Sequence, residues 1–375
     1  MPPEFIIFGV LILGIAVFHH RTFEVAVIGT LILFLYKVLV RDLQILDHLA
    51  HESRLLVNLF GLLLGFAILS KHFEESRLPE WLPQHLPKDW KGGLALLAIV
   101  ATVSTFLDNI AAAIIGAVIA RHMYRDRVCL SFITAIVAAS NAGGAGSVIG
   151  DTTTTMMWIA GVPAAAFLKA FIAAITAVLF SGIVAARYQH AYHPPMDTVA
   201  KKVAIDGSRL FIVGLIVVGT IGANIAFDFP AVGLWLGIFL GSLIRSTPWI
   251  QLRHAFRGSL FLILLVLSAS VMPVKGLPVP TWQSTFGLGL VSAVFDNIPL
   301  TALAIYQGGY DWGILAYAVG YGGSLIWFGS SAGVAISNIF PEARNTLNWV
   351  SQGWHIAAAY VLGFFVMLLM FGWTP

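Results

Sequence analysis

The chain has 375 residues, of which 58% are hydrophobic and only 10% are charged, and its mean hydropathy is +0.88. These values exclude an ordinary soluble domain. Apolar runs of membrane-spanning length recur throughout, which indicates an all-α polytopic membrane protein, and their continuity argues against a β-barrel. The net charge of +3 gives no indication of nucleic-acid binding, and the lone Cys129 excludes an intramolecular disulfide.

The apolar runs repeat in the same order in two halves, residues 1–187 and 209–375, separated by a hydrophilic linker at 188–208. The first run lacks a basic flank and a small-residue cleavage site, so we expect a retained helix and not a signal peptide. About 10 spans are expected in all. The regular ones lie at about 4–19, 22–40, 54–72, 163–187, 209–226, 230–246, 259–272 and 353–372, with short amphipathic connectors at 41–54 and 245–257.

The stretch 92–120 is too long for one straight span. As a single helix it would measure about 43 Å, against a hydrocarbon core of about 30 Å. Basic residues lie on both sides of it, Lys88 and Lys91 before and Arg121 after. Both ends are therefore expected on the cytoplasmic side, which predicts a re-entrant helical hairpin.

Orientation follows from the same rule. If the basic connections are cytoplasmic, both termini lie outside and the second half enters the membrane from the opposite side to the first. The chain is then two inverted repeats, each with a hairpin (92–120 and 285–306) and a broken helix (128–160 and 312–339). We expect a multi-pass protein of the cell inner (plasma) membrane.

Each predicted hairpin carries an Asp-Asn pair at its centre, Asp108-Asn109 and Asp296-Asn297. A carboxylate at membrane depth must be protonated, paired or bound to a cation, so matching carboxylates in inverted halves indicate an ion site near the midplane. The alternative is that each Asp only caps the second arm of its hairpin, because Asp and Asn are preferred N-cap residues. One residue can do both.

Each predicted broken helix carries a Gly-Gly pair and then a polar cluster. The first has Asn141, Gly143-Gly144 and the run Asp151 to Thr155. Irregular backbone at this depth is tolerated where it lines a cavity, and carboxylate, hydroxyl and carbonyl oxygens are hard ligands that suit sodium-like ions. The partner segment has Ser330 and Ser331 but no carboxylate at the place of Asp151, so the site is expected to be asymmetric.

These motifs resemble the NhaD-type sodium/proton antiporters of the larger ion transporter superfamily, which includes citrate, dicarboxylate and arsenite carriers. The resemblance covers most of the chain from about residue 92, and the Gly-Asp-x-Thr-Thr-Thr-Met element at Gly150–Met156 is its most specific part. It implies a homodimer, scaffold and transport domains in each subunit, and alternating access of the elevator kind.

We therefore expect a secondary transporter, not an enzyme, that exchanges sodium or lithium for protons and needs no cofactor. No P-loop pattern is present, so an ion gradient should drive it. The expected ligands of the transported cation are the carboxylates Asp108, Asp151 and Asp296. Neutral ligands or positioning groups are expected at Asn109, Asn141, Thr152, Thr153, Thr154, Asn297, Ser330 and Ser331.

A sodium- or proton-coupled carrier of citrate-like anions with the same fold is the alternative, and its substrate would bind at the helix N-termini in the hairpins. Three acidic residues near the site argue against it. Lys169 is placed close enough to a span end to snorkel, and His355 near the start of the last span is ambiguous.

Overall fold

A computed structural model describes residues 2–18, 21–81, 85–195 and 203–375, and these residues form helices with no strand among them. Part of the predicted linker, residues 196–202, lies outside the described residues. Six helical segments are long and apolar enough to cross a membrane, and several shorter apolar helices accompany them. The chain is thus an all-α polytopic membrane protein.

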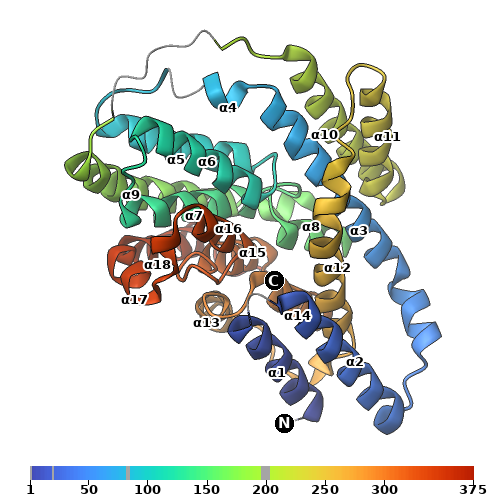
Figure 1. Ribbon diagram of the computed structural model, residues 1–375. Helices are drawn as coiled ribbons and strands as arrows, with labels where there is room; N and C mark the ends of the chain where they lie inside the picture. Colours follow the sequence, from blue (N-terminus) through green and yellow to red (C-terminus); the bar gives the residue numbers. More distant parts are fainter. Residues whose placement is uncertain (1, 19–20, 82–84, 196–202) are drawn as a thin grey trace.

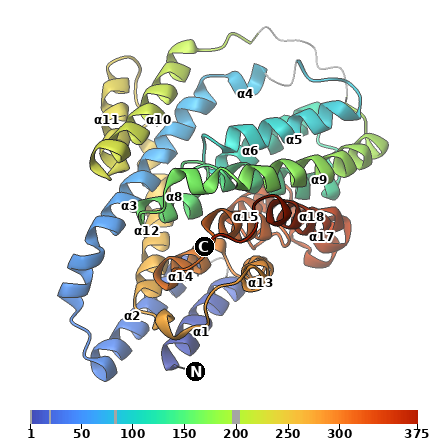
Figure 2. The same cartoon turned by 180° about the vertical axis from the view of Figure 1, so that it is seen from behind.

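The helices form two bundles that lie side by side in Figures 1 and 2. In the first bundle α3 packs on α10, α11 and α12, and α2 packs on α1 and α12. Its members come from the beginnings of both sequence halves. They are α1 (Pro3–Val17), α2 (Thr22–Arg41), α3 (Ile45–Glu75), α10 (Gly207–Phe227), α11 (Pro230–Ser242) and α12 (Ile250–Ser270).

In the second bundle α9 packs on α5, α7 and α18, while α15 packs on α7 and α13. Its main members are α5 (Trp90–Ser104), α6 (Asn109–Met123), α7 (Leu130–Ala145), α8 (Thr152–Ile159), α9 (Ala170–Tyr192), α13 (Trp282–Ser292), α14 (Asn297–Gln307), α15 (Trp312–Gly322), α16 (Ser331–Ile339) and α18 (Trp354–Phe371). Short helices α4 (Leu78–Trp81) and α17 (Thr346–Gln352) complete the set. The bundles meet where α14 lies against α12 and α8 against α3.

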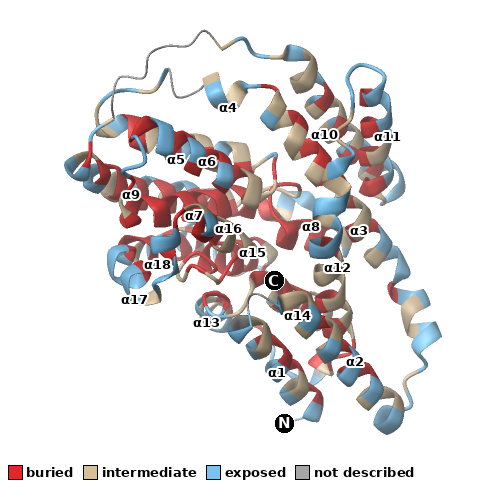
Figure 3. Ribbon diagram, viewed as in Figure 1, coloured by how far each residue is buried: buried red, intermediate tan, exposed pale blue. Residues whose placement is uncertain are grey.

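Two helices of the second bundle form its centre. Every residue of α7 is buried, and so is nearly all of α15, as the buried colouring in Figure 3 shows. By contrast, α10 and α11 expose large apolar side chains such as Val218, Ile225 and Leu236. Exposed apolar surface of this kind suits a helix that faces lipid.

The two Asp-Asn stretches are each divided into two helices. Helix α5 ends at Ser104 and α6 begins at Asn109, and α6 folds back on α5 so that a Cβ atom on Gly116 would lie 2.4 Å from a Val100 methyl carbon. Helices α13 and α14 are divided in the same way at 293–296. The predicted broken helices are likewise interrupted, at 146–151 and at 323–330.

The separate connector predicted at 41–54 is wrong, because α3 runs without interruption from Ile45 to Glu75. No proline interrupts this sequence. Gly61 and Gly65 lie within the helix, where they leave room for Trp235 and Leu234 of α11. The connector predicted at 245–257 also differs, since its second part forms the first turns of α12.

Candidate functional site

Each acidic candidate is the N-cap of a short helix. One carboxylate oxygen of Asp108 accepts the Ile110 N–H at 2.7 Å, and Asp296 accepts the Ile298 N–H at 2.9 Å. Asp151 caps α8 and accepts the Thr153 hydroxyl at 2.6 Å. Asp is preferred here because it satisfies free N–H groups and favours the positive end of the helix dipole. The N-caps expected at Asp108 and Asp296 are therefore present, and capping leaves each of these residues a second carboxylate oxygen.

Two buried asparagines connect the broken helices. The Asn109 amide donates to the Asn141 side-chain oxygen at 3.0 Å and to Asp151 at 3.4 Å. The Asn141 amide in turn donates to the hydroxyls of Ser324 at 2.9 Å and Ser330 at 3.0 Å. Because Ser324 and Ser330 belong to the second half of the chain, Asn141 joins the polar elements of the two halves directly.

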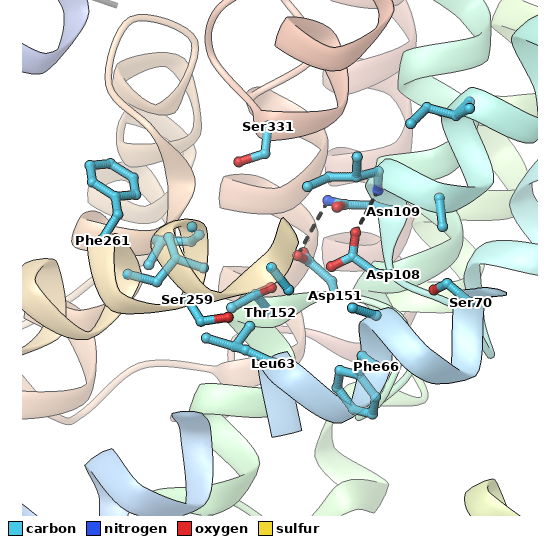
Figure 4. A pocket seen from close by; sticks show the side chains of 18 of the residues that line it. Leu63, Phe66, Ser70, Asp108, Asn109, Asp151, Thr152, Ser259, Phe261 and Ser331 are labelled. Carbon is cyan, nitrogen blue, oxygen red and sulfur yellow. Dashed lines mark hydrogen bonds between the residues drawn. The ribbon is translucent and has the colours of Figure 1, made fainter. Parts of the chain in front are cut away.

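A cavity of about 360 Å³ lies between the two bundles (Figure 4). On one side it is bordered by the beginnings of α6, α8, α14 and α16. On the other side it is bordered by α3, through Leu63, Phe66, Ala67 and Ser70, and by α12. The helix N-termini of the second bundle thus face a wall supplied by the first.

The cavity collects most of the predicted site residues. Six of them line it, namely Asp108, Asn109, Asp151, Thr152, Asn297 and Ser331. Asn141, Thr153 and Ser330 lie behind this surface, each hydrogen-bonded to Asp151, to Asn109 or to one another. Asp296 is not a lining residue, but it lies close enough to Asp151 and the Ser331 hydroxyl to interact with both.

Thr154 is the predicted ligand that the structure places elsewhere. Its hydroxyl donates to the carbonyl oxygens of Ser147 at 2.5 Å and Asp151 at 2.9 Å. Thr155 bonds to Val148 and Asp151 in the same way. These two hydroxyls satisfy backbone groups left free by the break, and the sequence alone does not distinguish them from Thr152.

Sequence reasoning missed the wall opposite the carboxylates. Ser70 of α3, and Gln251 and Ser259 of α12, line the cavity. The available signal was spacing, because 251, 255, 258, 259 and 262 fall on one face of a helix. Gln251 and Ser259 share this face only because α12 begins at Ile250, whereas the sequence predicts a connector at Gln251.

The donor set consists of oxygen atoms from carboxylate, amide and hydroxyl groups, which hard cations prefer. Among the described residues, no group of three His, Cys, Asp or Glu side chains lies close enough to hold a metal ion. Asp108, Asp151 and Asp296 thus do not form a three-carboxylate centre in this conformation. A bound cation would need the neutral oxygens as well.

Two further candidates lie away from the cavity. Lys169 forms an ion pair with the fully buried Asp311 at 2.6 Å and donates to Thr374 at 2.9 Å, so it ties α15 to the end of the chain. His355 shares a hydrogen bond of 2.7 Å with Ser131, which joins α18 to α7. Lys169 thus has a structural role, whereas the buried His355 has one partner on Nε2 and none on Nδ1 among the described residues.

Membrane-spanning helices, two broken helical elements in contact and a cavity that carboxylates border between two bundles are typical of a membrane transporter. The model of the citrate transporter family, CitMHS, matches residues 6–322, so the chain belongs to this family of transporters and is not an enzyme. The resemblance to NhaD-type proteins is confirmed by individual relatives.

Three of these relatives illustrate the similarity. Sodium/proton antiporter 1 of Arabidopsis thaliana is 28% identical over 346 residues, which cover 80% of this chain and 58% of the relative. Sodium/proton antiporter 2 of the same plant is 26% identical over 341 residues, 77% and 79% of the two chains. The Na(+)/H(+) antiporter NhaD of Vibrio cholerae is 25% identical over 326 residues, 72% and 68%.

Proposed function

We propose that this transporter exchanges sodium or lithium for protons across the membrane by alternating access. The observation that carries the proposal is the convergence of Asp108, Asp151 and neutral oxygen donors on one cavity between two bundles. The names of the plant and bacterial relatives support it, although the chain spans only 58% of the first of them.

The exchange follows from the chemistry of a buried carboxylate. In a low-dielectric site a lone negative charge is too unstable, so the group holds either a proton or a cation. Asp151 is the central group, because Asn109 and Thr153 both donate to it and orient its oxygens. Sodium and proton thus compete for one site, and movement of one bundle against the other exposes that site to the opposite face.

We also propose that the two halves are inverted repeats and that the cavity faces the cytoplasm. Ser70 and Gln251 border the cavity at the ends of α3 and α12 that carry Lys71 and Arg253, which the positive-inside rule assigns to the cytoplasm. On this orientation both termini lie outside, in a plasma-membrane protein that the resemblance implies to be a homodimer.

A polar contact crosses the boundary between the bundles at its other end, which supports an inward-facing state. The Tyr306 hydroxyl of α14 donates to Glu52 of α3 at 2.7 Å. His48 of α3 and Ser270 of α12 share a hydrogen bond of 2.8 Å beside it. Glu52 is 8% exposed, so its contact with Tyr306 is largely buried.

The test is proton flux in reconstituted vesicles challenged in turn with sodium, lithium, potassium and citrate. Sodium and lithium should drive proton movement, and Asp108→Asn or Asp296→Asn should abolish it, because the amide cannot exchange a proton for a cation. Unchanged exchange in these variants, at normal amounts of folded protein, would overturn the proposal.

The family model's description favours one second candidate, a cation-coupled carrier of citrate-like anions. The helix N-termini of α6, α8, α14 and α16 would then hold the substrate carboxylates. Uptake of labelled citrate or succinate, measured beside sodium-driven proton flux in the same proteoliposomes, separates the two. Citrate uptake without cation-driven proton flux would establish the carrier.

A further inference from the structure

The α12 wall of the cavity is built from one helical face. Gln251, Ala255, Gly258, Ser259 and Leu262 line the cavity at spacings of four, three, one and three residues. A Cβ atom on Gly258 would have nothing within 4 Å, so no other part of the chain packs against the helix at this residue. The neighbouring Ser259 hydroxyl is therefore not covered by the side chain that precedes it.

Ser259 is buried and has no hydrogen-bond partner among the described residues. The residue is only 4% exposed, and it lines the cavity. Other serines of α12 are satisfied, since Ser268 shares a hydrogen bond of 2.8 Å with Thr30 and Ser270 donates to the Leu267 carbonyl at 2.8 Å. The Ser259 hydroxyl therefore borders the cavity without a protein partner and is available to a ligand bound there.

The opposite wall offers a second hydroxyl of the same kind. Thr152, the first residue of α8, is 8% exposed and its hydroxyl has no partner among the described residues. Ser259 and Thr152 border the same cavity as the Asp108 and Asp151 carboxylates, as Figure 4 shows. Oxygens from both bundles thus converge on one space.

We propose that Ser259 is a ligand of the transported cation, supplied by the bundle that does not carry the acidic residues. This inference rests on the proposed sodium/proton exchange and adds a feature to it. Asp108, Asp151 and Thr152 stay with the cation when the bundles move, whereas Ser259 contacts it only in the conformation described here. Ser259 therefore sets the cation affinity on the cytoplasmic face and not on the outer face.

The kinetic test compares Ser259→Ala with Ser268→Ala, a matched serine on the same helix whose partner is Thr30. In everted vesicles, which expose the cytoplasmic face, Ser259→Ala should raise the KM for sodium about fivefold, the effect of one lost polar contact, with kcat unchanged. Right-side-out vesicles should give the wild-type KM. Ser259→Thr should restore the affinity, and Ser268→Ala should leave both values unaltered.

An unchanged KM in Ser259→Ala, or an equal change on both faces, would overturn the proposal while wild-type exchange still supports the general function. A second measurement does not depend on exchange. Ser259→Cys, made with Cys129→Ser, should react with a membrane-impermeant thiol reagent added to everted vesicles. Sodium or lithium chloride, but not choline chloride, should slow this reaction. Equal rates in all three salts would exclude Ser259 as a ligand, whatever flux the wild type shows.

Discussion

The two broken elements, α7–α8 and α15–α16, share their packing but not their chemistry. The Ser104 hydroxyl donates to the Ser140 carbonyl of α7 at 2.5 Å, and the Ser292 hydroxyl donates to the Val319 carbonyl of α15 at 2.8 Å. Each serine lies four residues before its Asp, and each carbonyl lies three residues before its Gly-Gly pair. The two halves therefore place their Asp-bearing turns by the same contact.

The glycines repeat the correspondence. A Cβ atom on Gly143 would lie 1.9 Å from the Ala101 carbonyl oxygen, and one on Gly322 would lie 2.1 Å from the Gly289 carbonyl oxygen. Ala101 and Gly289 are both seven residues before their Asp. Glycine is needed at both places because backbone meets backbone.

The side chains that face the site differ instead. The place of Asp151 is taken by Ser330, and the place of Asn141 is taken by Gly320. A Cβ atom on Gly320 would lie 3.3 Å from an Asp151 carboxylate oxygen. The missing side chain at Gly320 therefore leaves space beside the Asp151 carboxylate. The packing contacts thus correspond in the two halves, while the carboxylate and the asparagine side chain are present in the first half alone at these positions.

The largest expected effect distinguishes Asp151 from Ser330, the corresponding N-cap residues of α8 and α16. Asp151→Asn should abolish sodium-driven proton flux, because it removes the only carboxylate at this pair of positions. Ser330→Ala should lower the flux only a few-fold, because it removes two neutral hydrogen bonds, from the Asn141 amide and from the Gly333 N–H. Flux in proteoliposomes checks both, with size-exclusion profiles to confirm folding. Equal losses would mean that the halves are functionally equivalent.

The shared packing predicts equal sensitivity of the two glycines. Gly143→Ala and Gly322→Ala should each lower the free energy of unfolding by about 1–3 kcal/mol. The reason is that a backbone carbonyl oxygen cannot move aside like a flexible side chain. Thermal unfolding in detergent measures this. Gly222→Ala is the matched control, because its Cβ atom would have nothing within 4 Å. Tolerance of Gly322→Ala alone would break the correspondence.

The serine contacts should be equivalent and smaller. Ser104→Ala and Ser292→Ala each remove a buried hydrogen bond to a carbonyl and should cost about 1 kcal/mol of unfolding free energy. Ser53→Ala removes an exposed bond within α3 and should change little. A difference between Ser104 and Ser292 well beyond 1 kcal/mol would show that one turn depends on other contacts.

The smallest expected effect tests the space beside Asp151. Gly320→Ala should leave the unfolding temperature nearly unaltered, because the contact of 3.3 Å requires a shift of only a few tenths of an ångström. It should nevertheless raise the KM for sodium a few-fold by displacing the carboxylate. If KM and stability both stay at wild-type values, the space left by Gly320 has no part in cation binding.

The sequence alone determined the membrane class, the interruptions at Asp108 and Asp296, and most of the polar residues around the cavity. These features are local, because hydropathy, helix-breaking glycines and N-cap preferences act within a few residues. The positions of the breaks therefore agree with the motifs, whereas the start of α3 at Ile45 was missed because its first turns carry polar residues.

Which helices face the carboxylates follows from the packing of the bundles. Ser259 is 151 residues from Asp108 in sequence and borders the same cavity, and Asn141 reaches Ser330 across the two halves. The tertiary structure also distinguishes Thr152, which faces the cavity, from Thr154, which bonds to backbone carbonyls. Such pairings depend on how whole helices pack, and local patterns along a chain do not encode which faces meet.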